Sequence, residues 1–502
     1  MTYTDKTERW GVFELTADGK SDGNPFADYT IKAQFTNGKE SVSVNGFYDG
    51  NGIYKVRFMP RFEGDYSFSV SGTFSEEILT GNFTVTPPQN SNHGYVEVQD
   101  KFHFSYADGT PYFCIGTTCY VWHLQTDKLI EQTLETLKNS PFNKIRFCIF
   151  PKHYDYNLGE PRSYPYEGTP MDSSVLTREN FWQYGGDNPD NHWDFTRFNP
   201  EYFSHIEGCI EKLMNMGIEA DLILMHPYDR WGFSRLNRED SAHYLRYVTA
   251  RFSAYRNVWW SLANEYDILS HKTTDDWEFY AQTVMDNDPY GHLRSIHNCG
   301  EFYDHTKPWI THCSIQRQDL YKSSELVNEW RERFQKPIVL DEIAYEGDIP
   351  HGWGNITAEE MTRRFWEAVC RGGCPGHGET YLCGENILWW SHGGILRGQS
   401  AQRIAFLRSV TQDIPEMRLK PGNAAWDEVC GVPENGQGGY YLFYYSFMRP
   451  SSRDYYFDDE NYYNVQIIDT WNMTVENAGC FKGKFTVKLH ARQYTAVKIT
   501  RA

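Results

Sequence analysis

Apolar and polar residues alternate with period two near both ends of the chain. Before residue 90, four such segments are separated by Asn-Gly and Asp-Gly turns, and they cover residues 29–35, 52–59, 65–70 and 81–86. After about residue 415 the same pattern returns in residues 439–445, 463–469, 484–489 and 494–500. Short strands without a helical period between them are typical of small β-sandwiches. We therefore expect an N-terminal β-sandwich over residues 1–90 and a C-terminal β-sandwich over residues 415–502.

Between these segments, apolar runs of strand length alternate with helical patterns. The runs are residues 112–116, 144–150, 220–225, 258–263, 292–297, 309–314, 337–342 and 385–390. A weak helical pattern separates the fifth run from the sixth. Eight strands with helices between them predict an α/β fold, a (β/α)8 TIM barrel over residues 91–414 that is flanked by the two β domains. A doubly wound open sheet is the alternative, but a Gly-rich first turn is missing.

Composition excludes several classes of protein. The net charge of −19, without a long Lys/Arg block, argues against a nucleic-acid-binding surface. The chain has no run of 18 apolar residues, which argues against a membrane span, and its start lacks the apolar segment of a leader. The 11 cysteines are scattered singly, as expected for reduced core thiols. We therefore expect a cytoplasmic protein.

Polar and aromatic residues follow the predicted strands. In a TIM barrel these positions converge on the C-terminal mouth, where active sites lie. The side chains expected there are Trp122, His123, Arg146, Lys152, His153, His226, Trp231, Asn264, Glu265, His297, Gln316, Glu342, Trp390 and His392. The chain also holds 16 Trp, 35 Tyr and 31 Phe, whose flat faces suit stacking on sugar rings.

Two carboxylates, Glu265 and Glu342, end the fourth and seventh predicted strands, which face each other across a barrel mouth. Glycoside hydrolysis needs one protonated carboxyl group and one ionised carboxylate on either side of the bond. Burial would raise the pKa of Glu265 and suit it to act as the acid, whereas Arg146 could hold Glu342 ionised or be purely structural. Glu265 could instead cap a loop or pair with an arginine. The rival nucleophiles are Glu346, the main one, and Asp267 and Asp341.

The sequences Trp-Ser-Leu-Ala-Asn-Glu at residues 260–265 and Pro-Ile-Val-Leu-Asp-Glu-Ile-Ala-Tyr-Glu at residues 337–346 resemble those of the apiosidase-like glycoside hydrolases. That family belongs to the clan of retaining (β/α)8-barrel enzymes, and β domains bracket its barrel. The resemblance implies that Glu265 is the acid/base, Glu342 the nucleophile and Asn264 the ligand of a sugar 2-hydroxyl. The family pattern has Asp where this chain has Glu265, so apiose specificity is not implied.

The accessory residues are expected to bind substrate. His226 and His297 suit hydrogen bonds to sugar hydroxyls, and Trp390 is either a sugar platform or a core residue. The expected substrate-binding residues are Asn264, Trp122, His123, Arg146, His153, His226, Trp231, His297, Gln316, Glu346, Trp390 and His392. No His-x-His or His-Glu-x-x-His motif is present, so neither a metal nor another cofactor is expected.

The function predicted from these residues is a retaining glycoside hydrolase that cleaves a small glycoside or an oligosaccharide. One alternative is an inactive barrel that only binds glycans. Another is a metal-dependent hydrolase in which His226, His297 and His312 assemble in space. The expected partner is a carbohydrate, with no nucleic acid or membrane, and the protein could be a homo-oligomer. The long segment at residues 151–195 is expected to rim the site or to form a dimer contact.

Overall fold

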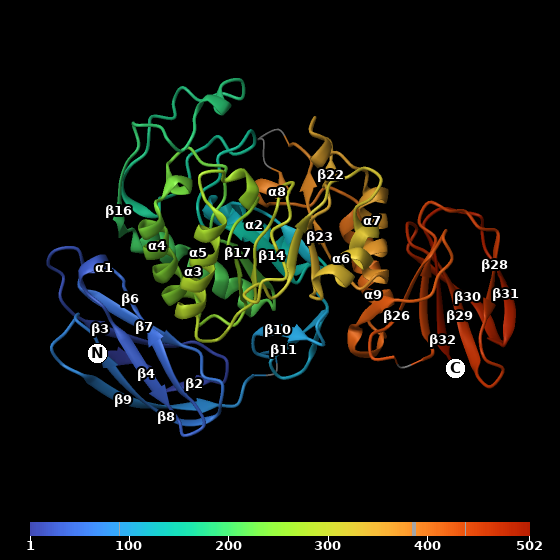
Figure 1. Cartoon of the computed structure of the whole chain (residues 1–502), viewed down its shortest axis with the longest axis horizontal. Coiled ribbons are helices and arrows are strands. Elements are labelled where there is room, and N and C mark those ends of the chain that lie inside the picture. The colour runs from blue at the N-terminus through green and yellow to red at the C-terminus, as the bar shows by residue number, and fades with distance from the viewer. Residues whose placement is uncertain (90, 384–387, 437) are drawn as a thin grey trace.

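The computed structural model describes residues 1–89, 91–383, 388–436 and 438–502, which form three parts along the long axis of the molecule (Figure 1). The first part, blue in Figure 1, is a pair of β-sheets. One sheet has the order β1 (Thr2–Tyr3), β3 (Phe13–Asp18), β7 (Ile53–Phe58) and β6 (Phe47–Tyr48). The other has the order β2 (Lys6–Glu8), β9 (Leu79–Thr86), β8 (Gly64–Ser71), β4 (Lys32–Thr36) and β5 (Ser41–Asn45). The four segments predicted from the alternation correspond to β4, β7, β8 and β9, and the other strands of these two sheets were not predicted.

The central part is a parallel eight-stranded sheet. Its strands, in chain order, are β13 (Gly116–Thr118), β14 (Lys144–Cys148), β17 (Glu219–Ile223), β18 (Val258–Ser261), β19 (Arg294–Ser295), β20 (Cys313–Gln316), β21 (Ile338–Glu342) and β23 (Cys374–His377). The two ends of the sheet, β19 and β20, are joined by a parallel bridge between His297 and Ser314, which closes the barrel. The predicted (β/α)8 fold is confirmed.

Helices cover the outside of the barrel (Figure 1). They are α2 (Asp127–Lys138), α3 (Pro200–Asn215), α4 (Arg238–Phe252), α5 (Thr274–Asn287), α6 (Val327–Phe334), α7 (Ala358–Cys370) and α9 (Ser400–Thr411). Residues 296–312 are all described and form no helix, so the weak helix predicted between the fifth and sixth strands is wrong. Of the described helices, none is long and apolar enough to cross a membrane.

The first predicted strand, residues 112–116, is divided between two structures. Pro111–Tyr112 forms β12, which pairs with β11 (His103–Tyr106), and β11 pairs in turn with β10 (Val96–Gln99) in a small antiparallel sheet below the barrel (Figure 1). Phe104 of this sheet packs against Trp259 of β18, with ring centroids 5.3 Å apart. The apolar period of this segment thus comes from a plug that closes the N-terminal end of the barrel, and the barrel strand begins only at Gly116.

The eighth strand is also different from the prediction. The apolar run at 385–390 lies partly outside the described residues, and its end belongs to the short helix α8 (Trp389–His392). The barrel strand is instead Cys374–His377, with the sequence Cys-Pro-Gly-His. A Cβ on Gly376 would lie 2.9 Å from the Leu340 carbonyl oxygen of β21, so the close approach of this neighbouring strand requires glycine. Packing therefore overrides strand propensity here.

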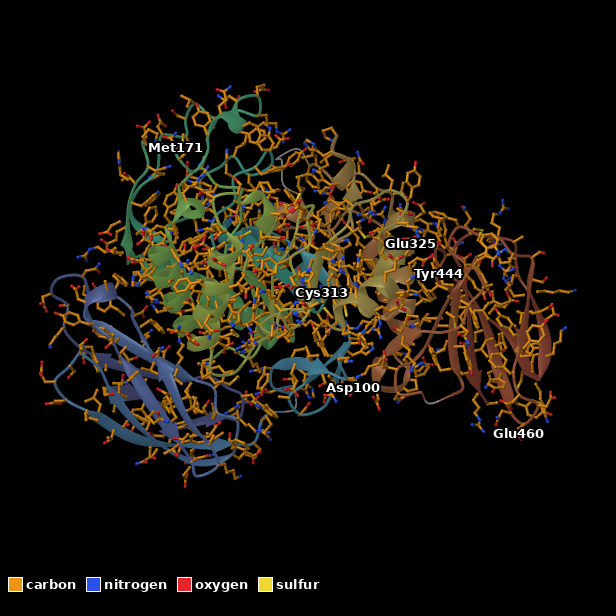
Figure 2. All side chains as sticks on the ribbon, viewed as in Figure 1. Asp100, Met171, Cys313, Glu325, Tyr444 and Glu460 are labelled. Atoms are coloured by element: carbon orange, nitrogen blue, oxygen red, sulfur yellow. The ribbon has the colours of Figure 1, made fainter. Side chains whose placement is uncertain are left out.

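The third part is a β domain that rests on α7 (Figure 1). Its larger sheet has the order β25 (Leu419–Pro421), β26 (Val429–Pro433), β27 (Tyr440–Tyr444), β32 (Thr495–Arg501), β29 (Tyr462–Asp469) and β30 (Thr474–Lys482). Its smaller sheet pairs β28 (Ser452–Tyr456) with β31 (Lys484–Lys488). Tyr444 lies at the junction with the barrel (Figure 2), and its ring stacks 5.5 Å from that of Trp366 on α7. This buried stack fixes the domain to the barrel.

A buried ion network joins the N-terminal domain to the barrel. Glu207 of α3 lies 2.6 Å from Arg57 of β7 and 2.5 Å from Arg251 of α4. Arg251 also contacts Asp49, at 2.7 Å. Glu207 is 6% exposed, Arg57 4% and Arg251 0%, so removal of Glu207 would leave two buried guanidinium groups short of a counter-charge.

We expect Glu207→Gln to lower the free energy of unfolding by about 3–5 kcal/mol, because a buried charge that loses its partner is strongly destabilising. Urea titration followed by circular dichroism measures this change. The matched control is Glu14→Gln. Glu14 also contacts Arg57, at 2.7 Å, but its side chain is 35% exposed. We expect the control to cost about 1 kcal/mol or less. Equal effects of the two variants would contradict the role given to the buried network.

Candidate active site

The backbone places Glu265 at the barrel mouth in a strained conformation. Strand β18 is buried throughout, and the amides that flank Glu265 are tied to neighbouring strands, since Asn264 N–H donates to the Met225 carbonyl and Tyr266 N–H to the His297 carbonyl, both at 2.9 Å. Glu265 itself has φ +49°, in the left-handed region. For a residue other than glycine this costs about 1–3 kcal/mol, and such strain clusters at active sites. The fold therefore holds this carboxyl group in position at a cost in stability.

Glu342, the last residue of β21, is surrounded by donors. Its Oε1 accepts hydrogen bonds from the Tyr120 hydroxyl and from Arg146 Nη1 at 3.2 Å, and His297 Nε2 lies 3.2 Å from the same oxygen. Burial favours the neutral acid, but the contacts with His297 and then with Arg146 and Tyr120 outweigh it and lower the pKa of Glu342 to about 2. Glu342 is therefore ionised at neutral pH.

Glu265 has neutral donors instead. Its Oε2 accepts from the Tyr228 hydroxyl and from Asn264 Nδ2 at 3.2 Å. Burial raises the pKa of Glu265 above its ordinary value, and the negative charge of Glu342 raises it further. Lys152 acts in the opposite direction and lowers it. The two carboxyl groups thus share one buried site but have pKa values shifted in opposite directions.

Asn264 and Arg146 connect the two carboxyl groups. Arg146 donates from Nη2 to Asn264 Oδ1 at 2.8 Å and from Nη1 to Glu342, so its planar fork spans the site. The Tyr120 hydroxyl lies 3.2 Å from the same Asn264 oxygen. Since Asn264 Nδ2 faces Glu265, the amide orientation is determined by this network.

His297 is oriented by groups below the mouth. Its Nδ1 lies 2.9 Å from Ser314 Oγ, which donates to Asp341 Oδ2 at 2.5 Å. Asp341 also contacts Lys144 at 2.7 Å. Ser314 gives its single proton to Asp341, so it accepts from Nδ1–H of His297, and this directs Nε2 toward Glu342. The Asp341 carboxylate is therefore engaged in the barrel interior, which argues against its role as a nucleophile.

Asp267, the other weak rival, has a local structural role. Its carboxylate accepts backbone hydrogen bonds from Cys299 at 2.6 Å, Gly300 at 2.7 Å and Glu301 at 2.9 Å. These bonds hold the loop after β19 against the loop after β18. Asp267 thus braces the mouth and does not point toward Glu342.

Three other residues selected from the sequence lie at or beside the carboxyl groups. Gln316 Oε1 is 3.1 Å from His297 Nε2. Trp390 packs edge-on to Tyr120, with centroids 5.2 Å apart, and is 4% exposed. His226 is buried behind the site, with Nε2 3.3 Å from the Phe150 carbonyl oxygen. Its pKa is lowered to about 3 by burial and by the nearby Lys152.

Four selected residues lie away from the carboxyl groups. Trp122 and His123 pack against Phe147, which points out of the barrel, and both are 0% exposed. His153 and Trp231 hold the segment after β14, because His153 Nε2 contacts the Phe181 carbonyl and Trp231 donates to Glu160 at 3.2 Å. These four residues are consequently part of the packing that supports the mouth.

The segment after β14 contributes to the site at its beginning. Tyr154 packs against Tyr228 and Trp390, with centroids 5.2 and 5.8 Å apart. His392 lines a cavity of about 70 Å³ together with Lys152 and Trp231. Farther along, β15 (Tyr166–Thr169) and β16 (His192–Phe198) form an antiparallel ribbon, and Met171 of this segment lies above the barrel in Figure 2. The segment therefore rims the mouth.

Glu346 lies outside the group around Glu342. Of the described residues, only Glu346, His377 and Glu379 bring three possible metal ligands within 4.8 Å of one another. Both carboxylates accept backbone hydrogen bonds at the start of α9, Glu379 from Arg397 and Gly398 and Glu346 from Gln399 and Ser400. The positive end of a helix attracts these carboxylates and repels a cation, so the donor set does not suit a metal. His312, proposed for a metal site in the alternative, packs 5.2 Å from Trp259 at the opposite end of the barrel.

We expect Glu346→Gln to lower the free energy of unfolding by about 1–3 kcal/mol, because an amide in place of the carboxylate turns one acceptor into a donor that faces other donors. Those donors are the amides of Gln399 and Ser400, at 2.8 and 3.0 Å, and the Tyr381 hydroxyl at 3.1 Å. Chemical denaturation measures the loss. We expect kcat/KM for a cleaved glycoside to stay within about threefold of the wild type, and a loss of activity by orders of magnitude in a folded variant would restore Glu346 as a nucleophile.

Tyr120 and Tyr228 were missed in the sequence. Each hydroxyl bonds one of the two carboxyl groups, Tyr120 that of Glu342 and Tyr228 that of Glu265. Both follow predicted strands, Tyr228 only two residues after the selected His226. In a chain with 35 tyrosines, a tyrosine near a strand end is a weak signal, and only the fold distinguishes these two.

Comparisons with known proteins bear on the family and on the fold. Residues 98–441 match the family model described as "Apiosidase-like, catalytic domain", and residues 6–73 and 426–500 match two domains of unknown function. A putative glycoside hydrolase from Bacteroides vulgatus ATCC 8482 is 36% identical, covers 99% of this chain and 100% of its own, and superposes with a TM-score of 0.91. A glycoside hydrolase family 5 protein of the same organism is 16% identical over 82% of this chain and 93% of its own, with a TM-score of 0.61, and shares the fold. No curated protein matches significantly.

A closed parallel barrel with two buried carboxyl groups at its C-terminal mouth, together with these matches, defines a glycoside hydrolase. The chain belongs to the apiosidase-like family. The resemblance found in residues 260–265 and 337–346 is therefore confirmed.

Proposed function

We propose that the protein is a retaining glycoside hydrolase that cleaves a small glycoside or an oligosaccharide by double displacement. Glu265 acts as the acid/base and Glu342 as the nucleophile. The observation that carries the proposal is the contrast between their partners. Glu342 contacts two cationic or protonatable side chains, Arg146 and His297, whereas Glu265 is bonded by the neutral groups of Tyr228 and Asn264.

The hydrogen-bond partners of the two carboxyl groups indicate which group performs each step of the proposed reaction. Glu342, ionised, attacks the anomeric carbon and forms an ester as the glycosidic bond breaks. Glu265, whose neutral form burial favours, gives its proton to the departing oxygen. Glu265 then takes a proton from water, and the oxygen of that water displaces Glu342 from the sugar. Two inversions at one carbon give net retention.

Asn264 and Trp390 support sugar binding in this scheme. The amide of Asn264 lies between the two carboxyl groups, where a sugar 2-hydroxyl next to the anomeric carbon would lie. Trp390 is packed edge-on against Tyr120 and offers an aromatic wall to the sugar ring. Both carboxyl groups are nearly buried, at 5% and 4% exposure, which suits a site that excludes water until the leaving group departs.

The test is a screen of aryl glycosides, furanosides included, followed by NMR of the first product formed. We expect hydrolysis of at least one glycoside and a first product with the anomeric configuration of the substrate. A product of inverted configuration would contradict the double displacement. Binding of a glycan without hydrolysis would favour the inactive-barrel alternative, and loss of hydrolysis with EDTA would favour a metal-dependent enzyme.

A further inference from the structure

Lys152 is a buried lysine at the centre of the site. It follows β14 at the start of the rim segment, and the residue is 4% exposed. Its Nζ lies 3.4 Å from the ring centroid of Tyr120, 4.2 Å from that of Tyr228 and 4.6 Å from that of Trp390. Among the described residues, aromatic faces rather than hydrogen-bond acceptors surround this ammonium. A desolvated ammonium on an aromatic face is stabilised by the negative electrostatic potential of the ring.

The two tyrosines connect the ammonium to the two carboxyl groups. The hydroxyl of Tyr120 bonds Glu342, and the hydroxyl of Tyr228 bonds Glu265. The ammonium of Lys152 thus contacts the faces of both tyrosine rings, and the hydroxyls of these rings bond the two carboxyl groups. A cation fixed at this point acts on both carboxyl groups through space and also orders the rings that bind them.

The surrounding charges keep Lys152 protonated at neutral pH. Burial lowers the pKa of Lys152 to about 8, and the acidic groups around it, Cys148 first and then Glu265 and Glu342, limit that decrease. The titratable and charged groups that face Glu265 or Lys152 come from five strand ends and the segment after β14, and they are Tyr120, Arg146, Cys148, Tyr154, His226, Tyr228, His297, Cys299 and Glu342.

The charge of the site changes during the proposed reaction. When the glycosyl-enzyme forms, Glu342 becomes a neutral ester and Glu265 becomes a carboxylate. Arg146 is bound to Glu342 and Asn264 and not to Glu265. Among the groups that lower the pKa of Glu265, Lys152 has the largest effect, through its positive charge. It is therefore placed to stabilise the carboxylate that remains after proton transfer.

Resting on the proposed function, we propose that Lys152 is a positioning residue that stabilises Glu265 as a carboxylate after it has protonated the leaving group, and that orders Tyr120 and Tyr228 on the two reacting groups. The lysine takes no proton and forms no bond in this role. It acts through Glu265, so its removal changes the pH dependence of the reaction as well as its rate.

The experiment compares Lys152→Met with the wild type, and with Lys152→Arg, which keeps the charge. The first readout is the pH profile of kcat/KM for a glycoside with a poor leaving group. A nearby cation favours the carboxylate form of Glu265, so its loss raises the pKa of that acid. We expect the alkaline limb, where the acid loses its proton, to move upward by about one pH unit or more in Lys152→Met and to change little in Lys152→Arg.

The second readout does not depend on activity. Infrared titration follows the carbonyl band of the protonated Glu265, which is assigned by its loss in Glu265→Gln, and we expect the same upward shift of about one unit. The matched control is Lys272→Met. Lys272 is half-buried, lies over the Tyr280 ring at 5.1 Å and has a pKa lowered to about 8, but its charged neighbour is Asp276. We expect no shift in this variant.

An unchanged alkaline limb and an unchanged Glu265 band in a folded Lys152→Met variant would overturn the proposal, even if the rate fell at every pH. A band shift in a protein that hydrolyses no glycoside would support the coupling of Lys152 to Glu265 and overturn the proposed hydrolase. Shifts of equal size in Lys152→Met and Lys152→Arg would assign the effect to packing and also overturn it.

Discussion

Glu342→Gln is expected to lower kcat/KM for any glycoside that the wild type cleaves by on the order of 10⁴-fold or more, because no covalent intermediate can form without the nucleophile. The amide keeps the size of the side chain but removes the charge that Arg146 and His297 contact at 3.2 Å. Initial rates of aryl glycoside hydrolysis measure the loss, and circular dichroism checks the fold.

A rescue experiment distinguishes lost chemistry from lost structure. Glu342→Ala leaves space for azide, which should attack the anomeric carbon directly and give a glycosyl azide of inverted configuration. Glu346→Gln is the matched control for Glu342→Gln, since it makes the same substitution four residues farther along, at a carboxylate that accepts hydrogen bonds from the start of α9. Glu342→Gln with activity within tenfold of the wild type would remove Glu342 from the nucleophile role.

Glu265→Gln is expected to lower kcat/KM by about 10²–10⁴-fold for a glycoside with a poor leaving group, which is the range for loss of general acid catalysis. For a dinitrophenyl glycoside the first step needs no proton, so its rate should fall far less. Formation of the glycosyl-enzyme would then outpace its hydrolysis, and a burst of dinitrophenol should precede a slow steady state. Stopped-flow absorbance measures the burst, and mass spectrometry detects the glycosyl-enzyme.

Asp267→Asn is the control for this second prediction. Asp267 lies two residues from Glu265, but its carboxylate accepts backbone amides of residues 299–301. We expect any loss in this variant to be the same for good and poor leaving groups, because proton donation is unaffected. An equal loss for both substrates in Glu265→Gln, without a burst, would indicate that Glu265 serves only to bind the sugar.

The strands that the sequence predicted well are those whose pattern comes from local burial. Residues 144–150 and 337–342 are buried runs, and the structure places β14 and β21 there. The pattern fails at the eighth strand, because Cys374–His377 is selected by its close contact with β21 rather than by strand propensity. It fails at the first strand because the plug below the barrel has an apolar period of its own.

The residues selected for the candidate site also differ in how far the sequence could place them. Asn264, Glu265 and Glu342 were selected because they follow or end buried apolar runs, and such runs can be found in the sequence alone. Trp122 and His123 were selected by the same rule, yet they pack against Phe147 outside the barrel. The turn after a strand can direct a side chain to either side of the sheet, and the sequence pattern does not specify which.

The sequence by itself determined that one glutamate follows the fourth strand of a parallel barrel and another ends the seventh, because buried apolar runs and chain order decide where strands end. Only the tertiary structure decided their opposite pKa shifts, since Arg146 and His297 reach Glu342 from other strands while Tyr228 and Asn264 hold Glu265. It also decided the place of Lys152, whose ammonium is brought between Tyr120 and Tyr228 by the pairing of β14 with β13 on one side and β17 on the other. Contacts between residues far apart in sequence have no local pattern, and the charges of this site depend on them.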